Sequence, residues 1–346
     1  RSRTPCARPM NSCSVMESPI VATSTGCAPR SRSGRNTAPP RKRLHSVVTA
    51  TANADNSAEA QHELSGRRIA CMEVWGGHDC FHGEVSVPGN DVFVGCDPYT
   101  SDSHGGDIYY VSSCAAGLIT RFVLADVSGH GIVVAEAAAS LRGLMRRYIN
   151  TPDQSRFARA LNKSFSHKNG LFATALLVSY FAPSDHLIIC NAGHPRPLYY
   201  SASTQQWRYL DHESDGVVKQ THSKSVGLSN LPLGVISPTQ YEQFALPLEK
   251  GDLIVLYSDA FIEVRTADGK PWGEDGLLQA VREVSVADPA QLRSDLLASI
   301  LSQSNTPRLD DDVTMIVLHH NASDPPRQGL RERAVVLGKL LGLVAS

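Results

Sequence analysis

The feature of this sequence that most restricts its fold is a series of short apolar runs joined by tight turns. Phe172 to Phe181 and Leu187 to Cys190 are separated by a Pro-Ser-Asp turn, which predicts a β-hairpin and therefore antiparallel pairing. Val85 to Val87 and Val92 to Val94 are split by the turn signal Pro88-Gly89-Asn90. Adjacent strands joined this closely favour an antiparallel sheet over alternating βαβ units.

The rest of the chain continues the same pattern of strands in groups and helices between them. Further strands are predicted at Ile119–Val127, Tyr241–Leu246, Leu253–Tyr257 and Val313–His319, the second and third of these joined across Lys250-Gly251-Asp252. Helices are predicted at Val133–Tyr148, around Phe157–Phe165, at Leu277–Val284 and at Gln291–Leu301. Because the helices cluster in pairs between the strand groups, the sequence predicts an α+β fold built in layers.

The N-terminal segment differs in composition from the remainder. Residues 1–65 contain nine Lys or Arg against four Asp or Glu, and no Phe, Trp or Tyr. Such a segment buries too little apolar surface to offset its ordering entropy, so we expect a disordered basic Ser/Thr/Pro-rich tail. Two other interpretations stay open: translated upstream sequence, with Met72 as a plausible start, or a transit peptide. The expected folded domain covers residues 66–322.

Charge and hydropathy narrow the class of partner. The 346-residue chain has a net charge of -1, which argues against nucleic acid as a partner. No run of about 18 apolar residues occurs, so no transmembrane segment is predicted and a cytoplasmic location is expected. Within residues 323–346, Leu330 to Val344 has an apolar face. This helix could pack on the domain, form a homodimer or partner contact, or lie on a membrane surface.

The strongest chemical signal is the position of the aspartates. Asp107, Asp126 and Asp259 fall at glycine-rich turns or strand ends, and Asp310-Asp311-Asp312 precedes the last strand. A single Asp at a strand end is usually a turn former. Four such positions suggest a cluster of carboxylates, which is costly to bury unless a cation neutralises it. Oxygen ligands suit Mg²⁺ or Mn²⁺, and two such ions can activate a water for attack on phosphorus.

The ordered set of motifs resembles a known family. The motifs are Gly105-Gly106-Asp107, Asp126-Val127-Ser128-Gly129-His130-Gly131, Asn191-Ala192-Gly193-His194-Pro195, Leu233-Gly234, Gly251 to Asp259, and Asp311-Asp312-Val313-Thr314. In this order they resemble the PPM-type protein serine/threonine phosphatases of the SpoIIE/RsbU-like group, over roughly residues 85–320.

The resemblance implies a fold, an activity and a partner. The implied fold is a four-layer αββα sandwich with two central antiparallel sheets. The implied activity is metal-dependent hydrolysis of phosphoserine or phosphothreonine on a signalling partner, with a STAS-type anti-anti-sigma factor in a partner-switching circuit as one candidate. The implied cofactors are two divalent cations, Mn²⁺ or Mg²⁺, and the attacking group is water, so no Ser or Cys nucleophile is needed.

The resemblance also assigns roles to particular residues. Asp107, Asp126, Asp259 and Asp311 match its metal ligands, and the Val127 carbonyl is a further candidate ligand. His130 is the candidate catalytic residue, which would orient substrate or donate a proton, although it could equally shape its turn. For His194 we expect a structural role.

Two positions depart from the family's pattern, and a third agrees with it. Tyr110 stands where the family usually has a second aspartate, and Ala260 stands where it usually has glycine. We expect Tyr110 to change the rim of the site and Ala260 to restrict the backbone. Glu263 matches the family's usual acid.

Alternative chemistries find less support. His78, Cys80 and His82, with Cys71 nearby, could form a soft-metal cluster, but they lack a paired C-x-x-C arrangement. No G-K-[ST] follows the glycine pairs and no G-x-S-x-G elbow occurs, so the sequence gives no P-loop and no hydrolase elbow. Two functions remain as alternatives: a partner-binding pseudophosphatase with little activity, and a metal hydrolase for a small phosphorylated metabolite, which a deep closed pocket would favour.

Overall fold

A computed structural model describes the greater part of the predicted folded domain. The described residues are 67–68, 73–77, 80–99, 105–114, 117–129, 131–149, 151, 153–165, 170–219, 228–266, 269–304 and 306–324. The predictions for the tail 1–65, for His130 and for the helix at Leu330–Val344 lie outside these residues.

Two seven-stranded sheets form the centre of the fold. The first sheet contains, in spatial order, β1 (Arg67–Arg68), β3 (Phe81–Val87), β4 (Asn90–Asp97), β14 (Val313–His320), β13 (Leu253–Tyr257), β9 (Leu198–Ser201) and β10 (Gln206–Tyr209). The second contains β11 (Val218–Lys219), β12 (Gln243–Pro247), β8 (His186–Ala192), β7 (Ala173–Phe181), β6 (Ile119–Val127), β5 (Asp107–Cys114) and β2 (Glu73–Gly77). All strand pairs are antiparallel except β1 with β3.

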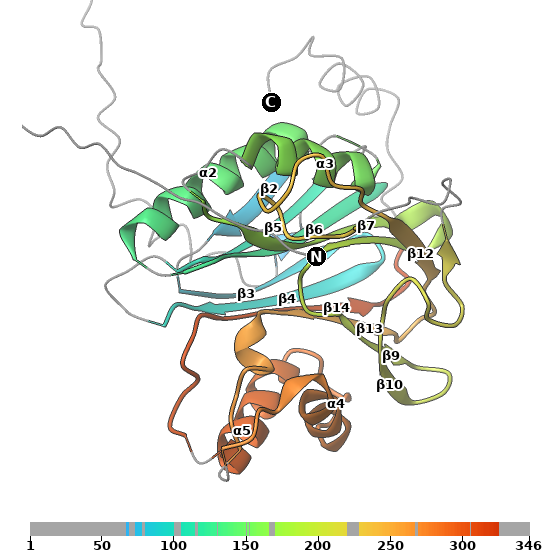
Figure 1. The fold of residues 1–346 in the computed structure, drawn as a ribbon. Coiled ribbons are helices and arrows are strands. Elements are labelled where there is room, and N and C mark those ends of the chain that lie inside the picture. The colour runs from blue at the N-terminus through green and yellow to red at the C-terminus, as the bar shows by residue number, and fades with distance from the viewer. Residues whose placement is uncertain are drawn as a thin grey trace, which may run out of the picture. The chain divides into compact units, whose positions relative to one another are not determined.

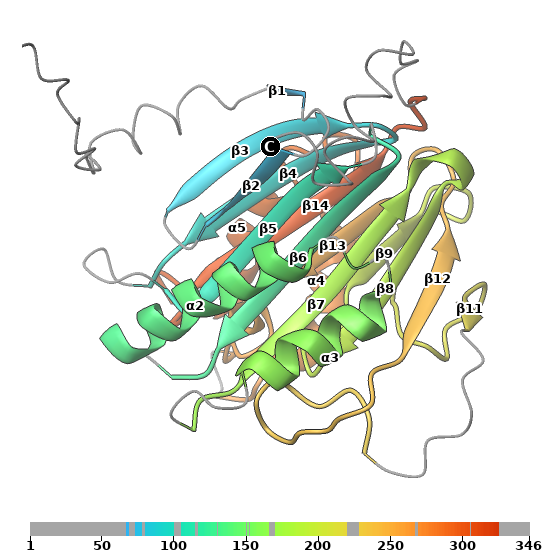
Figure 2. The same ribbon diagram turned by 90° about the horizontal axis from the view of Figure 1, so that it is seen from above.

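Helices cover the outer face of each sheet (Figure 1). The helices α2 (Ile132–Tyr148) and α3 (Gln154–Phe165) lie side by side across the second sheet, as the view from above makes plain (Figure 2). The helices α4 (Gly273–Glu283) and α5 (Leu292–Ser304) cover the first sheet. The predicted four-layer αββα sandwich with two central antiparallel sheets is therefore confirmed.

Three apolar clusters hold these layers together. One lies between the sheets and includes Val92 and Leu124; a second joins the second sheet to α2 and α3 and includes Leu141; a third joins the first sheet to α4 and α5 and includes Leu277. Because the sheets are covered on both faces, the central strands are buried along most of their length and do not alternate between buried and exposed residues. All five residues of β13 are buried, for example.

Most predicted elements are confirmed, and the differences affect how the sheets connect. The turn at Pro88–Gly89 joins β3 to β4, and a 3₁₀ turn (Ala182–Ser184) joins β7 to β8. The strands on either side of Lys250-Gly251-Asp252 do not pair with each other, because β12 belongs to the second sheet and β13 to the first. Buried Asp252 holds this crossing: it accepts hydrogen bonds from the Tyr199 hydroxyl and from the Ala202 and Glu249 amides.

In the part of the chain that the structure describes, no helix combines the length and the apolar character needed to cross a bilayer.

Candidate active site

Asp107 and Asp126 are brought together by strand pairing. Asp107 is the first residue of β5, and its register partner on β6 is Asp126. Directly opposed residues of antiparallel strands have Cβ atoms about 5 Å apart, and two like charges placed in this way repel each other. The side chain of Asp107 is buried, and its Oδ2 atom finds no hydrogen-bond partner among the described residues. An ionised carboxylate in this position needs a counter-charge.

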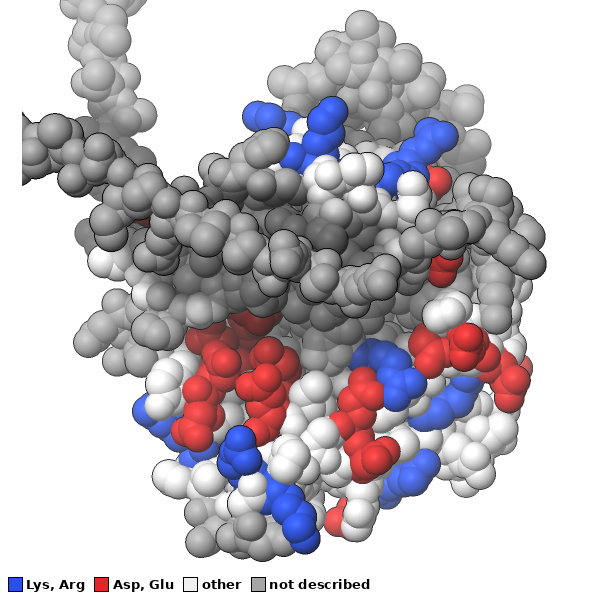
Figure 3. Space-filling view, viewed as in Figure 1, with Lys and Arg blue, Asp and Glu red and all other residues white. Residues whose placement is uncertain are grey.

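The other carboxylates come from the first sheet. Tyr257 pairs with Met315, so β13 and β14 bring Asp259 and the Asp311-Asp312 pair to the same sheet end. The Ser258 hydroxyl donates to the Asp312 carbonyl at 2.9 Å, and the Ser258 amide donates to the Thr314 carbonyl at 2.9 Å. Figure 3 shows Asp and Glu side chains gathered over the loop before β14 and the turn after β13.

Asp312 joins the two groups of carboxylates. Its Oδ2 atom accepts the Gly106 amide at 2.6 Å, and its Oδ1 atom accepts the Tyr99 amide at 2.8 Å. The Asp107 amide also points at Oδ2, at 3.4 Å. The end of the first sheet is thereby fixed against the start of β5. The motif comparison gave Asp311 a role but none to Asp312, whose contacts only the folded chain reveals.

The carboxylates raise one another's pKa, which indicates that they face a common space. Burial, followed by repulsion from Asp259 and Asp311, raises the pKa of Asp126 to about 7. Burial, followed by repulsion from Glu263 and Asp311, raises the pKa of Asp259 to about 6. Burial and the Asp126 charge raise the pKa of Asp107 well above its ordinary value. The site opens to solvent from buried Asp107 to exposed Asp311.

The backbone at Gly106 completes the set of oxygen atoms. A Cβ atom at this position would lie 2.8 Å from the Val127 carbonyl oxygen and 3.0 Å from Asp126 Oδ1. Both oxygens therefore face the same small space, which only glycine leaves open. A buried carboxylate oxygen without a partner and a ligand set made of oxygen fit Mg²⁺ or Mn²⁺. Asp107, Asp126, Asp259, Asp311 and the Val127 carbonyl could hold such ions.

His194 lies beneath the carboxylates and connects the two sheets. Its Nδ1 atom is 2.8 Å from the Thr174 hydroxyl, and Thr174 is the register partner of Asp126. Its Nε2 atom donates to the Tyr257 carbonyl at 3.0 Å, two residues before Asp259. Burial lowers the pKa of the ring to about 4, so the imidazole is neutral near pH 7. The predicted structural role of His194 is confirmed.

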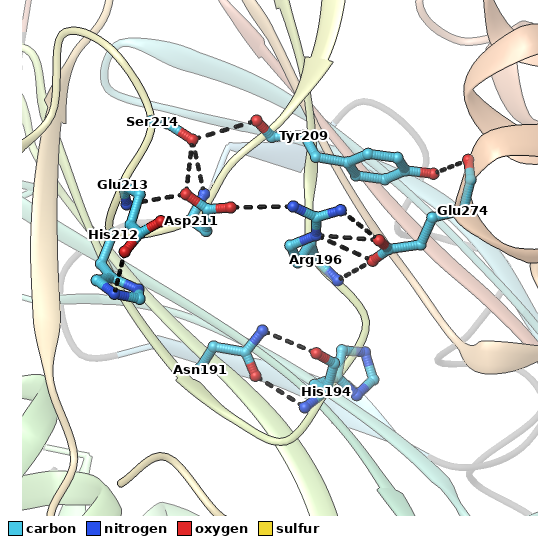
Figure 4. A network of polar contacts seen from close by, with 9 residues as sticks. All are labelled: Asn191, His194, Arg196, Tyr209, Asp211, His212, Glu213, Ser214 and Glu274. Carbon is cyan, nitrogen blue, oxygen red and sulfur yellow. Dashed lines mark hydrogen bonds and ion pairs between the residues drawn. The ribbon is translucent and has the colours of Figure 1, made fainter.

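The loop that carries His194 is fixed by a polar network (Figure 4). The Asn191 side chain donates to the His194 carbonyl and accepts the His194 amide, at 2.8 and 2.7 Å. Further along, the Arg196 guanidinium binds Glu274 of α4 at 2.5 Å and Asp211 at 3.0 Å. Since two carboxylates already neutralise Arg196, it serves to anchor the loop to α4. A cavity of about 240 Å³ adjoins this network.

The expectation for Tyr110 is wrong, and the expectation for Ala260 stays a prediction. Tyr110 is buried in the cluster between the second sheet and α2, so it does not reach the rim of the site. On β5 it lies three residues from Asp107, on the opposite face of the strand, because side chains alternate. Ala260 is buried in a 3₁₀ turn (Asp259–Phe261), a conformation that alanine adopts without strain.

Comparison with known proteins identifies the family. A family model described as Stage II sporulation protein E (SpoIIE) matches residues 119–321. The chain belongs to the SpoIIE family. This match includes Asp126, Val127, Asp259 and Asp311, whereas Asp107 precedes it.

One curated relative and several solved structures extend the comparison. The phosphoserine phosphatase RsbU of Bacillus subtilis (strain 168) is 26% identical over 239 residues, which cover 68% of this chain and 62% of RsbU. The chain thus spans less than two thirds of that relative's length.

The structure of the RsbU and RsbW domains of Rv1364c from Mycobacterium tuberculosis superposes with a TM-score of 0.56 and 24% identity, covering 80% of this chain and 71% of the other. The SiaA-PP2C domain of Pseudomonas aeruginosa gives 0.53 with 15% identity, over 66% and 85% of the two chains. At these identities the structures support the shared SpoIIE and PP2C fold.

Proposed function

We propose that this SpoIIE-family chain is a metal-dependent protein phosphatase that hydrolyses phosphoserine or phosphothreonine on a partner protein. The observation that carries the proposal is the pairing of Asp107 with Asp126, with the Asp107 Oδ2 atom left without a partner among the described residues and Asp259 of the other sheet near enough to raise the pKa of Asp126. Membership of the family and the similarity to a phosphoserine phosphatase agree with it.

In this reaction some residues would bind the cations and others would hold the binding residues in position. Asp107, Asp126, Asp259, Asp311 and the Val127 carbonyl would hold one or two divalent cations, Mn²⁺ or Mg²⁺. When bound, the cations supply positive charge that polarises the phosphoryl group and lowers the pKa of an attacking water. Asp312 holds the Gly106 and Tyr99 amides in place, and His194 keeps the strand ends of Asp126 and Asp259 in register.

The surroundings of the carboxylates favour a protein substrate over a small metabolite. Phe172 is 42% exposed, and its carbonyl accepts the amide of Ser128, two residues after Asp126. Val235 and Ile236 are exposed beside it, in the loop that pairs with Ala173 through Leu233. Ile132 and Val133 are exposed at the start of α2. An apolar rim of this kind suits contact with another protein.

The partner is further proposed to be a signalling protein in the cytoplasm, with a STAS-type protein as the candidate. The alternative of a partner-binding pseudophosphatase rested on Tyr110 and Ala260, which lie away from the rim and in an unstrained turn. The homodimer through the C-terminal helix stays a prediction, since that segment lies outside the described residues.

A substrate comparison tests this proposal. Phosphate release by the full chain with Mn²⁺ should be fastest from a phosphoserine protein. An aryl phosphate should turn over slowly, and small phosphorylated metabolites should turn over least. Replacing Phe172 with serine should raise KM for the phosphoprotein and leave the rate on the aryl phosphate unchanged. Of these two substrates, only the phosphoprotein is large enough to contact the apolar rim. Equal rates on metabolites and phosphoprotein would instead favour a metabolite hydrolase, and no turnover from folded protein would favour the pseudophosphatase.

A further inference from the structure

A second group of metal-ligating side chains lies at the edge of the first sheet. Cys80 precedes β3, His82 is in β3, and Asp97 is the last residue of β4. Phe81 pairs with Cys96 and His82 with Gly95, so the hairpin brings all three side chains to one place. One ligand atom from each lies within 4.8 Å of the other two. His82 and Asp97 are 15 residues apart in the chain, so the spacing of Cys and His alone did not predict that Asp97 completes this cluster.

The contacts of this cluster centre on one carboxylate oxygen. His82 Nε2 is 2.7 Å from Asp97 Oδ1, and Cys80 Sγ is 3.5 Å from the same atom. A thiol, an imidazole and a carboxylate are the ligands that Zn²⁺ and similar borderline cations take, at about 2.0–2.3 Å. Cys80 and His82 are exposed, so their side chains can close around an ion without disturbing the core.

Asp97 is held in the orientation that a ligand needs. Arg293 of α5 binds the other carboxylate oxygen, Oδ2, and its side chain is 15% exposed. Gly95 makes room for this contact, because a Cβ atom there would collide with the Arg293 side chain. Hydrogen bonds to the far oxygen of a ligating carboxylate are typical of built metal sites. Oδ1 is therefore left facing Cys80 and His82.

We propose that Cys80, His82 and Asp97 form a three-ligand site for a Zn²⁺-type cation, with a fourth position left to water or a small anion. A cavity of about 230 Å³, lined by His82 and Arg293, adjoins the site on its His82 side. The site shares no residue with the carboxylates of the proposed phosphatase centre, and its donor set favours a different class of ion.

The two sites are nevertheless neighbours in the fold. Asp97 is the register partner of Val313, which directly follows Asp312. Two residues beyond Asp97, the Tyr99 amide donates to Asp312. A cation at Cys80, His82 and Asp97 would therefore fix the end of the strand that leads to the phosphatase centre.

Cobalt(II) provides a direct spectroscopic test, because thiolate ligation to Co²⁺ gives a near-ultraviolet charge-transfer band. Metal-free protein comprising residues 1–346 is titrated with Co²⁺ near pH 7.5, and then with Zn²⁺ as a competitor. We expect the saturated band to correspond to one thiolate-bound Co²⁺ per chain, apart from any Co²⁺ held by the carboxylates, and to disappear when Zn²⁺ is added. Cys80→Ser should abolish the band, and His82→Ala should weaken Co²⁺ binding by more than about tenfold.

Two control variants separate this site from the rest of the molecule. Asp126→Asn removes a carboxylate of the proposed phosphatase centre and should leave the band unchanged. Cys190→Ala removes a buried thiol and should also leave it unchanged. A band that survives in Cys80→Ser, or the lack of any band in the unaltered chain at saturating Co²⁺, would overturn the proposal.

Discussion

Replacing His194 with alanine should destabilise the fold and disturb the carboxylates together. The substitution removes two hydrogen bonds, to the Thr174 hydroxyl and the Tyr257 carbonyl, each contributing about 1 kcal/mol. The missing ring leaves a cavity in a site only 5% exposed, which adds about 2 kcal/mol. For a domain of this size, a total near 4 kcal/mol lowers Tm by about 8–16 °C.

Calorimetry of the metal-free protein measures this loss, with two matched variants for comparison. His194→Gln retains a side-chain donor for the Tyr257 carbonyl and should recover part of the lost stability. His212→Ala removes an exposed ring and should stay within about 0.5 kcal/mol of the unaltered chain. If His194→Ala unfolds at the same temperature as His212→Ala, the link between the sheets does not stabilise the fold.

The same residue should leave a signature in the pH dependence of stability. Burial lowers the pKa of His194 to about 4, below the value of about 6.5 in an unfolded chain. Between these two values the unfolded state binds more protons, so His194 makes stability rise with pH across this window. The share that His194 contributes to the slope of the free energy of unfolding against pH is at most about 1.4 kcal/mol per pH unit. His194→Gln should remove this share, and an unchanged slope in that variant would contradict the assignment.

Three further predictions concern the carboxylates and their neighbours. In chelator at pH 8, Asp126→Asn should be more stable than the unaltered chain in thermal unfolding. Because the pKa of Asp126 is raised to about 7 in the folded state, ionising this carboxyl destabilises the metal-free fold as the pH rises from about 4 through 7. Lower stability of the variant would contradict this prediction. Gly106→Ala should abolish the increase in Tm that Mn²⁺ gives, since the alanine Cβ atom would lie 2.8 Å from the Val127 carbonyl oxygen. An Mn²⁺-dependent shift in Tm equal to that of the unaltered chain would contradict this. Tyr110→Phe should keep full activity and equal or greater stability, because the buried hydroxyl finds no partner among the described residues; a loss of more than about 1 kcal/mol would contradict this.

Much of the fold could be predicted from the sequence because its turns are explicit. The hairpins β3–β4 and β7–β8 follow directly from short turns between apolar runs. The strand β5 was not predicted, because its sequence mixes Tyr and Ser with apolar residues although all of it is buried. Strand patterns also do not reveal which sheet a strand joins, so the crossing between β12 and β13 required the structure.

The candidate site was predictable as a set of residues but not as a geometry. Motif order selected Asp107, Asp126, Asp259 and Asp311, and pairing places the first two opposite each other. Asp312 accepts hydrogen bonds from the Tyr99 and Gly106 amides, which lie more than 200 positions away in the chain, so its role could not be predicted from local sequence. The expected effect of Tyr110 failed because β5 was not predicted as a strand, so the alternation that turns Tyr110 away from Asp107 was not anticipated.

The central claim is that the converging carboxylates hold a divalent cation that drives phosphate release. The most direct measurement is the rate at which the full chain releases phosphate from a phosphoserine protein. The chain is first freed of metal with a chelator, and Mn²⁺ is then titrated in. Asp126→Asn is compared with Asp295→Asn, a matched change at an exposed position on α5. We predict Mn²⁺-dependent turnover in the unaltered chain and in Asp295→Asn, and a loss of at least about a hundredfold in Asp126→Asn. Turnover that persists in chelator, or that survives in Asp126→Asn, would contradict the account.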